Sequence, residues 1–182
     1  MRPSRDEYLM GFARHAATMS TCPPRSKDAP NGVGAVIARD GRVLATGFNG
    51  SASGAPHCSD PKHGHMMRGA EATLALMYEL KQPVDAYAEE LVRKRMDHCV
   101  RTIHAEANAI ANAARYGIAV GDATLYSTSS PCLACFQRAI KAGIGRVVYE
   151  KVYWDDDPSR DLARELCIPY EQLSKNSCPN KY

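Results

Sequence analysis

Two short segments of this sequence carry side chains that can bind a metal ion and move protons. They are His104-Ala105-Glu106 and Pro131-Cys132-Leu133-Ala134-Cys135, and each lies at the start of a predicted helix. A helix N-terminus lowers the pKa of a nearby thiol, because its unpaired amides and its dipole favour negative charge. Cys132 and Cys135 are three positions apart, so on one helical turn they face the same side. With His104 as a third ligand, these cysteines predict a zinc site.

Glu106 is placed to act as a general acid and base at this site. Three protein ligands leave the fourth position of tetrahedral zinc to water, which distinguishes catalytic from structural sites. Glu106 is two positions after His104, so it can face that water without binding the metal, and a carboxylate there can accept and return protons. His-x-Glu with Pro-Cys-x-x-Cys is the signature of zinc nucleobase deaminases. It predicts attack of the activated water on C4 of cytosine, with Glu106 carrying a proton to N3 and then to the departing amino group.

Each motif taken alone has a simpler explanation. A Cys-x-x-Cys pair is often half of a structural zinc site or a redox pair, and His-x-Glu occurs by chance. The proline before Cys132, the 27 residues between His104 and Cys132 (105–131) and a βα unit at this place favour catalytic zinc. The alternative from another functional class is a non-catalytic zinc scaffold, which requires four protein ligands and gives Glu106 no role.

The rest of the pattern predicts the elements that hold these segments. Ser4 and Glu7 form a capping-box pattern before an amphipathic helix that runs to Met19 and is stopped by Cys22-Pro23-Pro24. Asp40-Gly41 joins two apolar stretches into a hairpin. The predicted elements are helix 4–19, strands 33–38 and 43–48, helix 105–116, strand 123–128, helix 132–142, strand 146–149, helix 159–166 after Asp157-Pro158, and strand 169–173. This order predicts an α/β fold with three α/β/α layers and a mixed sheet, parallel in its second half.

The composition predicts a single domain, residues 1–182, with a helical insertion at about 69–96 and a loosely held tail from about 174. The net charge of +3, from 23 basic and 20 acidic residues, is too even for a surface that tracks nucleic acid. No apolar run is long enough to span a membrane and the first residues lack a signal-peptide core, so we expect a cytoplasmic protein with no membrane partner. In that compartment, seven cysteines favour metal binding over disulfides.

Beyond these motifs, the sequence resembles the deoxycytidylate (dCMP) deaminase family, including its phage-type members, over most of residues 33–170. The matching segments are 33–37, 47–50, 56–58, 98–110, 123–126 and 130–135. The resemblance implies the cytidine-deaminase-like fold with a mixed five-stranded sheet, and conversion of dCMP to dUMP with release of ammonia. It also implies a homohexamer that dCTP activates and dTTP inhibits, with Mg²⁺ accompanying a bound triphosphate effector.

The resemblance also suggests residues that contact the substrate. Asn49 matches an asparagine that reaches the substrate sugar, although Asn49-Gly50 is also a common turn pair. Ala105 and Ser130, beside the zinc ligands, are assigned to the same substrate site. Arg25 is the candidate for the 5′-phosphate, with solvated surface charge as its alternative. Phe48 stands where the family usually has tyrosine, and it lacks a hydroxyl that could bond to the nucleotide.

A second, structural zinc is present in some phage-type relatives, and Cys22, Cys58 and His98 correspond to three of its ligands. The fourth ligand there is a histidine, and this chain has Thr102, which cannot replace imidazole on zinc. The candidates to substitute for it are Cys99, His57 and His65. The alternative is that these cysteines are buried free thiols.

Two enzymes of the same chemistry remain alternatives for the substrate. One acts on dCTP, which differs from dCMP only in its phosphates. The other is a tRNA adenosine deaminase, whose zinc motif is nearly identical but which needs a basic RNA surface. The near-neutral charge of this chain favours a small nucleotide and argues against a stable nucleic-acid partner.

Overall fold

The computed structural model describes residues 2–22, 32–58, 60, 67–68, 74, 77–89, 98–99, 101–153 and 156–173. The chain divides into two compact units, Met1–Gly50 with Ile103–Tyr182, and Ser51–Thr102. Both segments that carry the candidate zinc ligands belong to the first unit. Among the described helices, none combines the length and the apolar character that crossing a membrane requires.

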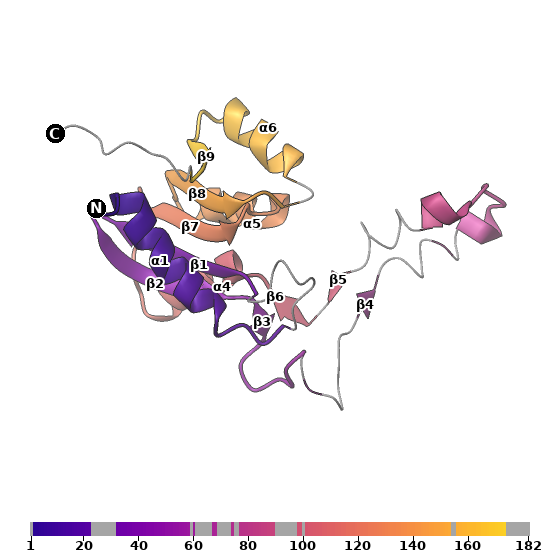
Figure 1. The fold of residues 1–182 in the computed structure, drawn as a ribbon, viewed down its shortest axis with the longest axis horizontal. Coiled ribbons are helices and arrows are strands. Elements are labelled where there is room, and N and C mark those ends of the chain that lie inside the picture. The colour runs from indigo at the N-terminus through magenta and orange to yellow at the C-terminus, as the bar shows by residue number, and fades with distance from the viewer. Residues whose placement is uncertain are drawn as a thin grey trace. The chain divides into compact units, whose positions relative to one another are not determined.

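The first unit is built on a five-stranded mixed sheet with the order β2-β1-β7-β8-β9 (Figure 1). The first three strands in that order pair antiparallel, whereas β7, β8 and β9 are parallel. The strands are β1 (Gly34–Arg39), β2 (Arg42–Phe48), β7 (Thr124–Ser129), β8 (Arg146–Lys151) and β9 (Tyr170–Gln172). The helices are α1 (Arg5–Ala17), α4 (Ala105–Arg115), α5 (Leu133–Lys141) and α6 (Asp157–Glu165). This confirms the predicted mixed sheet with a parallel second half.

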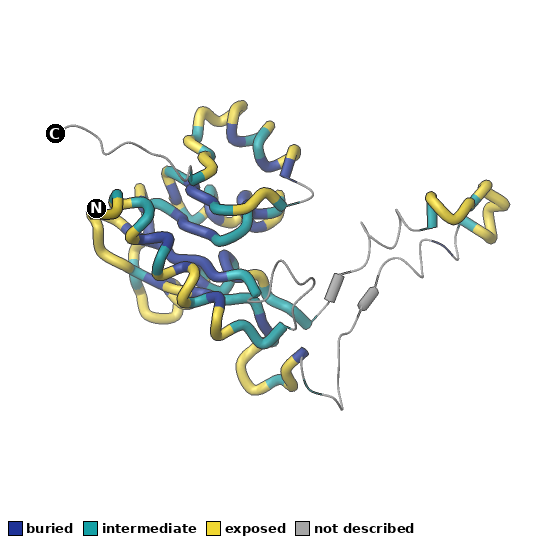
Figure 2. The backbone as a smooth tube through the Cα atoms, in the orientation of Figure 1, coloured by how far each residue is buried: buried dark blue, intermediate teal, exposed yellow. Residues whose placement is uncertain are grey.

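Alternate residues of the central strands face two different helical layers, as the period of two in a strand requires. One cluster joins α1 to the sheet and consists of Leu9, Met10, Ala13, Val36, Ala38, Tyr126 and Val148. The other joins the opposite face to α4, α5 and α6, and includes Ile37, Leu125, Val147, Ala109, Phe136 and Ala163. The buried backbone follows these strands in Figure 2. The three-layer α/β/α prediction is therefore confirmed.

Glycine lets helices approach the first two strands closely. A Cβ atom on Gly34 would lie 2.0 Å from the Ala13 carbonyl oxygen of α1, and one on Gly47 would lie 2.2 Å from the Ala105 carbonyl oxygen of α4. No residue larger than glycine fits at either position. The first turn of α4, with His104 and Glu106, is thus held against the end of β2.

The predicted hairpin turn is confirmed at Asp40-Gly41. Both residues have positive φ, 53° and 78°, which is the requirement of a tight type I′ connection. The capping box is also confirmed, because Ser4 Oγ accepts a hydrogen bond from the Glu7 amide and Glu7 Oε2 accepts one from the Ser4 amide. Asp6, in the first turn of the same helix, accepts hydrogen bonds from Tyr126 Oη at 2.7 Å and from the Arg146 guanidinium. The Arg146 guanidinium holds the pKa of Asp6 below its usual value.

The largest differences from the predicted helix bounds are at the end of α1 and at the start of α6. The first helix ends at Ala17, two residues before Met19 and well before the prolines. A tightened final turn follows Ala17, in which the amides of residues 18–20 donate to the carbonyls three residues back. The last helix begins at Asp157, two residues before the predicted start at 159, and its N-cap is Asp156 where Asp157 was predicted.

The second unit contains the predicted insertion. Residues 77–79 and 86–89 are helical, on either side of Pro83. Two short strands, β4 (Met67–Arg68) and β5 (His98–Cys99), pair antiparallel. The strands β3 (Gly50–Ser51) and β6 (Thr102–Ile103) form a further two-stranded sheet where the chain leaves the first unit and returns to it. Much of 69–96 and the tail from 174 lie outside the described residues, so the domain boundaries remain a prediction.

Candidate active site

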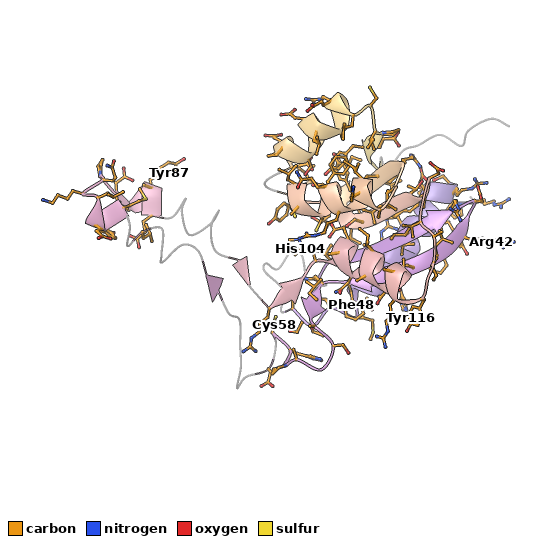
Figure 3. All side chains as sticks on the ribbon, turned by 180° about the vertical axis from the view of Figure 1, so that it is seen from behind. Arg42, Phe48, Cys58, Tyr87, His104 and Tyr116 are labelled. Atoms are coloured by element: carbon orange, nitrogen blue, oxygen red, sulfur yellow. The ribbon has the colours of Figure 1, made fainter. Side chains whose placement is uncertain are left out.

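The three predicted zinc ligands converge on one point. The ligand atoms of His104, Cys132 and Cys135 all lie within 4.8 Å of one another, and they form the one such group among the residues that the structure describes. His104 is the N-cap of α4 and Cys132 is the N-cap of α5, both in extended backbone conformation. Figure 3 shows His104 and Tyr116 at opposite ends of α4. Each motif therefore lies at a helix start, as predicted.

The spacing of these atoms fits a zinc ion. His104 Nδ1 lies 3.5 Å from Cys132 Sγ and 3.4 Å from Cys135 Sγ. Tetrahedral zinc with Zn–S near 2.3 Å and Zn–N near 2.05 Å would separate sulfur from nitrogen by about 3.6 Å. Two soft thiolates and an imidazole are also the donors that zinc prefers. Both distance and chemistry support a His-Cys-Cys zinc site.

The thiols are electrostatically prepared for a metal. The neighbouring Cys135 thiol, and then His104, lower the pKa of Cys132 to about 4. Cys135 has its pKa raised by the same neighbour, because the hydrogen bond between the two thiols favours the neutral form of Cys135. A hydrogen bond with Cys132 raises the pKa of His104 in turn. The surroundings thus favour a thiolate at Cys132, the form that binds a metal.

Glu106 lies in the first turn of α4 and is only 3% exposed. Burial is the largest influence on this carboxyl group and raises its pKa, while His104 acts in the opposite direction. Its Oε1 accepts a hydrogen bond from Ser127 Oγ at 3.1 Å, and Ser127 is itself completely buried. A carboxyl group whose pKa is raised toward neutrality suits both proton uptake and proton return.

Ser127 is a site residue that the sequence analysis missed. The strand pattern contained a signal, since Ser127 has the same parity as the buried Leu125 and so must face α4. It is paired with Ala35 of β1, whose small side chain leaves space at this position. A hydroxyl on a core-facing position of a strand needs a polar partner, and Glu106 supplies it.

Replacing Ser127 with alanine is expected to lower kcat about 10- to 100-fold, the range for losing a hydrogen bond to a charged group. KM should change little, because Ser127 is buried beneath Glu106 and contacts the carboxylate. Steady-state kinetics with the substrate proposed below measure both constants. The matched control is Thr128→Val, which removes a neighbouring hydroxyl that accepts a hydrogen bond from the Gly34 amide. Equal losses in the two variants would contradict a specific role for Ser127.

Asn49, predicted to reach the substrate sugar, directly follows the end of β2. Asn49 Oδ1 accepts hydrogen bonds from the Val33 amide at 2.6 Å and from the Ser20 hydroxyl at 2.7 Å. Within the described part of the chain, nothing accepts a hydrogen bond from its Nδ2 group. Asn108, another residue that sequence reasoning missed, donates to the Phe48 carbonyl at 2.7 Å and ties α4 to the strand end that carries Asn49. Asn49 thus has a structural role and retains a donor for a ligand.

Ala105 and Ser130 are both buried. Ala105 is fully enclosed at the first position of α4, so its methyl group cannot meet a substrate and its backbone amide is the one polar donor that it has. Ser130 Oγ accepts a hydrogen bond from the Tyr153 amide at 2.7 Å and so anchors the segment after β8. Arg25 lies outside the described residues.

The predicted second metal site is only partly described. Cys58 is buried, and its Sγ lies 3.4 Å from Thr102 Oγ1 and 3.5 Å from Ser51 Oγ. Thr102 therefore lies beside Cys58, where the sequence analysis expected the fourth ligand of related sites. The side chains of His98, Cys99 and His65 are outside the described residues.

Comparisons with known proteins agree with this geometry. The family described as "Cytidine and deoxycytidylate deaminase zinc-binding region" matches residues 3–151. The chain is 40% identical over 151 residues to the deoxycytidylate deaminase of Mycobacterium phage D29, covering 82% of this chain and 97% of that protein. It is 34% identical over 172 residues to ComE operon protein 2 of Bacillus subtilis (strain 168), covering 94% of this chain and 72% of that protein.

A solved structure shares the fold. The dCMP deaminase from cyanophage S-TIM5, in complex with dCMP and dUMP, superimposes with a TM-score of 0.64 at 24% sequence identity, covering 95% of this chain and 99% of that one. The family match covers both helix starts that carry the zinc ligands. On these grounds the chain belongs to the cytidine and deoxycytidylate deaminase family of zinc-binding proteins.

Proposed function

We propose that this protein deaminates dCMP hydrolytically to dUMP. The observation that carries the proposal is the buried Glu106 beside the convergent His104, Cys132 and Cys135. The similarity to the phage D29 deoxycytidylate deaminase, which is covered almost over its whole length, supports dCMP as the substrate. The dCMP and dUMP bound to a protein of the same fold are consistent with it.

The proposed chemistry exchanges the C4 amino group of cytosine for oxygen. Zinc bound by His104, Cys132 and Cys135 supplies a Lewis acid that lowers the pKa of water toward neutrality. Glu106 would accept a proton from the attacking water and deliver it to N3. It would then take the proton of the new C4 hydroxyl group and pass it to the amino group as the C4–N bond breaks. Water and dCMP thus give dUMP and ammonia. Ser127 keeps the Glu106 carboxyl group oriented through this sequence.

Four residues are proposed to bind the nucleotide. The Asn49 Nδ2 group is the donor for the sugar, because the other end of that amide is already held by Val33 and Ser20. The Ala105 amide, at the start of α4, is a donor for the base. Ser130 contributes through its backbone carbonyl, since its hydroxyl accepts from the Tyr153 amide and its own amide donates to the Lys151 carbonyl. Arg25 is proposed for the 5′-phosphate on chemical grounds alone.

A substrate panel tests this proposal. Zinc-loaded protein is incubated separately with dCMP, dCTP, deoxycytidine and a tRNA anticodon hairpin, and released ammonia and the deaminated product are measured. We expect the highest kcat/KM with dCMP and a much lower value with deoxycytidine, because the nucleoside lacks the phosphate. A higher kcat/KM with dCTP would show that the triphosphate, and not dCMP, is the substrate. Turnover of the hairpin alone would overturn the proposal.

The assembly and regulation implied by the family resemblance are further parts of the proposal. They are a cytoplasmic homohexamer that dCTP activates and dTTP inhibits, with Mg²⁺ accompanying the bound triphosphate. Repeating the panel with and without dTTP, and measuring the mass of the particle in solution, tests both. A second zinc at Cys58 requires another ligand in place of Thr102. Measuring the zinc content tests this, because a second site would give two ions per chain instead of one.

A further inference from the structure

Cys132 and Cys135 are held in place by different means. Cys135 is within α5, where the helix itself fixes its backbone. Cys132 is the N-cap, has extended backbone angles (φ −64°, ψ 161°) and makes no capping hydrogen bond with its side chain. Its carbonyl accepts the first helical hydrogen bond, from the Phe136 amide at 2.9 Å. The peptide on its other side, Pro131–Cys132, must be held from outside the helix.

That peptide is held by two hydroxyl groups distant in sequence. Ser159 Oγ, in the first turn of α6, donates to the Pro131 carbonyl at 2.8 Å, and both residues are fully buried. Tyr170 Oη, in β9, lies 3.2 Å from the same carbonyl and 2.6 Å from Asp156 Oδ1. Tyr170 has a single hydroxyl proton, so its contact with Pro131 is the weaker part of a shared hydrogen bond. Ser159 is therefore the principal donor.

The surroundings make this arrangement rigid. The Tyr170 ring packs edge-on against Phe136 of α5 at 5.2 Å between centroids, and against Tyr149 of β8 at 5.0 Å. Asp156, which accepts from Tyr170, is the N-cap of α6 and is only 3% exposed. Since the Pro131 carbonyl is buried, water cannot easily replace a lost donor, and the peptide would have to rotate to find another partner.

We propose that Ser159, supported by Tyr170, is a positioning residue of the metal site, whose hydroxyl fixes the Pro131–Cys132 peptide and thereby the Cys132 sulfur. Rotation of that peptide would move Cys132 relative to Cys135 and His104, whose positions depend on α5 and α4. The inference rests on the zinc site of the proposed function. It does not depend on which nucleotide the protein deaminates.

The test compares zinc binding in wild-type protein and in three full-length variants, Ser159→Ala, Tyr170→Phe and Tyr126→Phe. Zinc affinity is measured by competition with a chromophoric chelator, and ligand geometry by the visible spectrum of the Co²⁺-substituted protein. We expect Ser159→Ala to weaken zinc binding at least about tenfold, the lower end for removing an outer-shell partner, and to alter the Co²⁺ bands. Tyr170→Phe should cause a smaller loss, because Tyr170 is the weaker donor.

Tyr126→Phe is the matched control. It also removes a buried tyrosine hydroxyl that donates to a carboxylate, Asp6 at 2.7 Å, but on the opposite face of the sheet. Its thermal stability should fall while its zinc affinity and Co²⁺ spectrum stay those of the wild type. Unchanged zinc affinity in Ser159→Ala, or an equal loss in Tyr126→Phe, overturns the inference. If Ser159→Ala does not fold, the test rests on Tyr170→Phe. Zinc affinity and Co²⁺ bands identical to those of the wild type would then contradict the inference.

The outcome is separable from the fate of the proposed function. Wild-type protein that binds zinc tightly but does not deaminate dCMP would refute the substrate and leave the positioning role intact. Conversely, deamination of dCMP by the wild type together with unchanged zinc affinity in Ser159→Ala would support the proposed function and refute the positioning role.

Discussion

Replacing Glu106 with alanine is expected to leave zinc content intact and to abolish ammonia release, a loss of at least about 10²–10⁴-fold in kcat. Glu106 is not among the three convergent metal ligands, so its removal leaves the zinc site complete. What disappears is the group that accepts a proton from water and returns it to the leaving amine. Zinc per chain, ammonia release and far-UV circular dichroism are measured on the same samples.

Glu106→Gln separates proton transfer from packing. Glutamine fills the same buried space and can still accept a hydrogen bond from Ser127, but it cannot carry a proton. It should therefore be as inactive as the alanine variant and better folded. Glu150→Gln is the matched control, because Glu150 is a carboxylate that pairs with Arg14 of α1 and takes no part in the site. Full activity in either Glu106 variant would defeat the mechanism.

Replacing Cys135 with serine is expected to remove the metal and the activity together. A serine hydroxyl does not provide the thiolate that zinc binds, and Cys135 is the buried member of the cluster, so no other side chain can approach in its place without rearrangement. The loss of zinc affinity should exceed the roughly 10–100-fold typical of outer-shell changes. Metal content after dialysis and chelator competition measure it.

Cys167→Ser is the matched control for this variant. Cys167 is an exposed cysteine in the turn after α6 and contributes nothing to the zinc cluster. We expect it to retain one catalytic zinc and full activity. Zinc should also raise the melting temperature of the wild type and of Cys167→Ser, but not that of Cys135→Ser, because only a ligand that binds the folded state stabilises it. Tight zinc binding by Cys135→Ser would show that the ligand set is wrong.

The zinc ligands could be predicted from sequence because their geometry is mostly local. Cys132 and Cys135 are placed by one helical turn, and the start of that helix is marked by the proline before Cys132. The hairpin was predictable for the same reason, since Asp40 and Gly41 tolerate the positive φ that the turn needs. The end of α1 could not be predicted in this way, because the helix ends in a tightened turn at residues 18–20, before the prolines that mark a helix stop in the sequence.

The residues that support the site could not be predicted from the sequence. Ser127 binds Glu106 across 21 positions, Ser159 binds Pro131 across 28, and Tyr170 reaches the same carbonyl across 39. Serine and tyrosine occur widely, and nothing in their neighbours marks these three. Only the pairing of β7 with β1 and the packing of α6 and β9 beside α5 bring them to their partners.

The atoms that can bind zinc, the carboxylate beside them and the layered fold that carries both were predictable from sequence, because they follow from residue chemistry and short-range periodicity. Tertiary structure alone decided how close α4 lies to Gly47, which hydroxyl orients Glu106 and what fixes the peptide before Cys132. Those contacts join segments that are far apart in the sequence, so they depend on the whole fold.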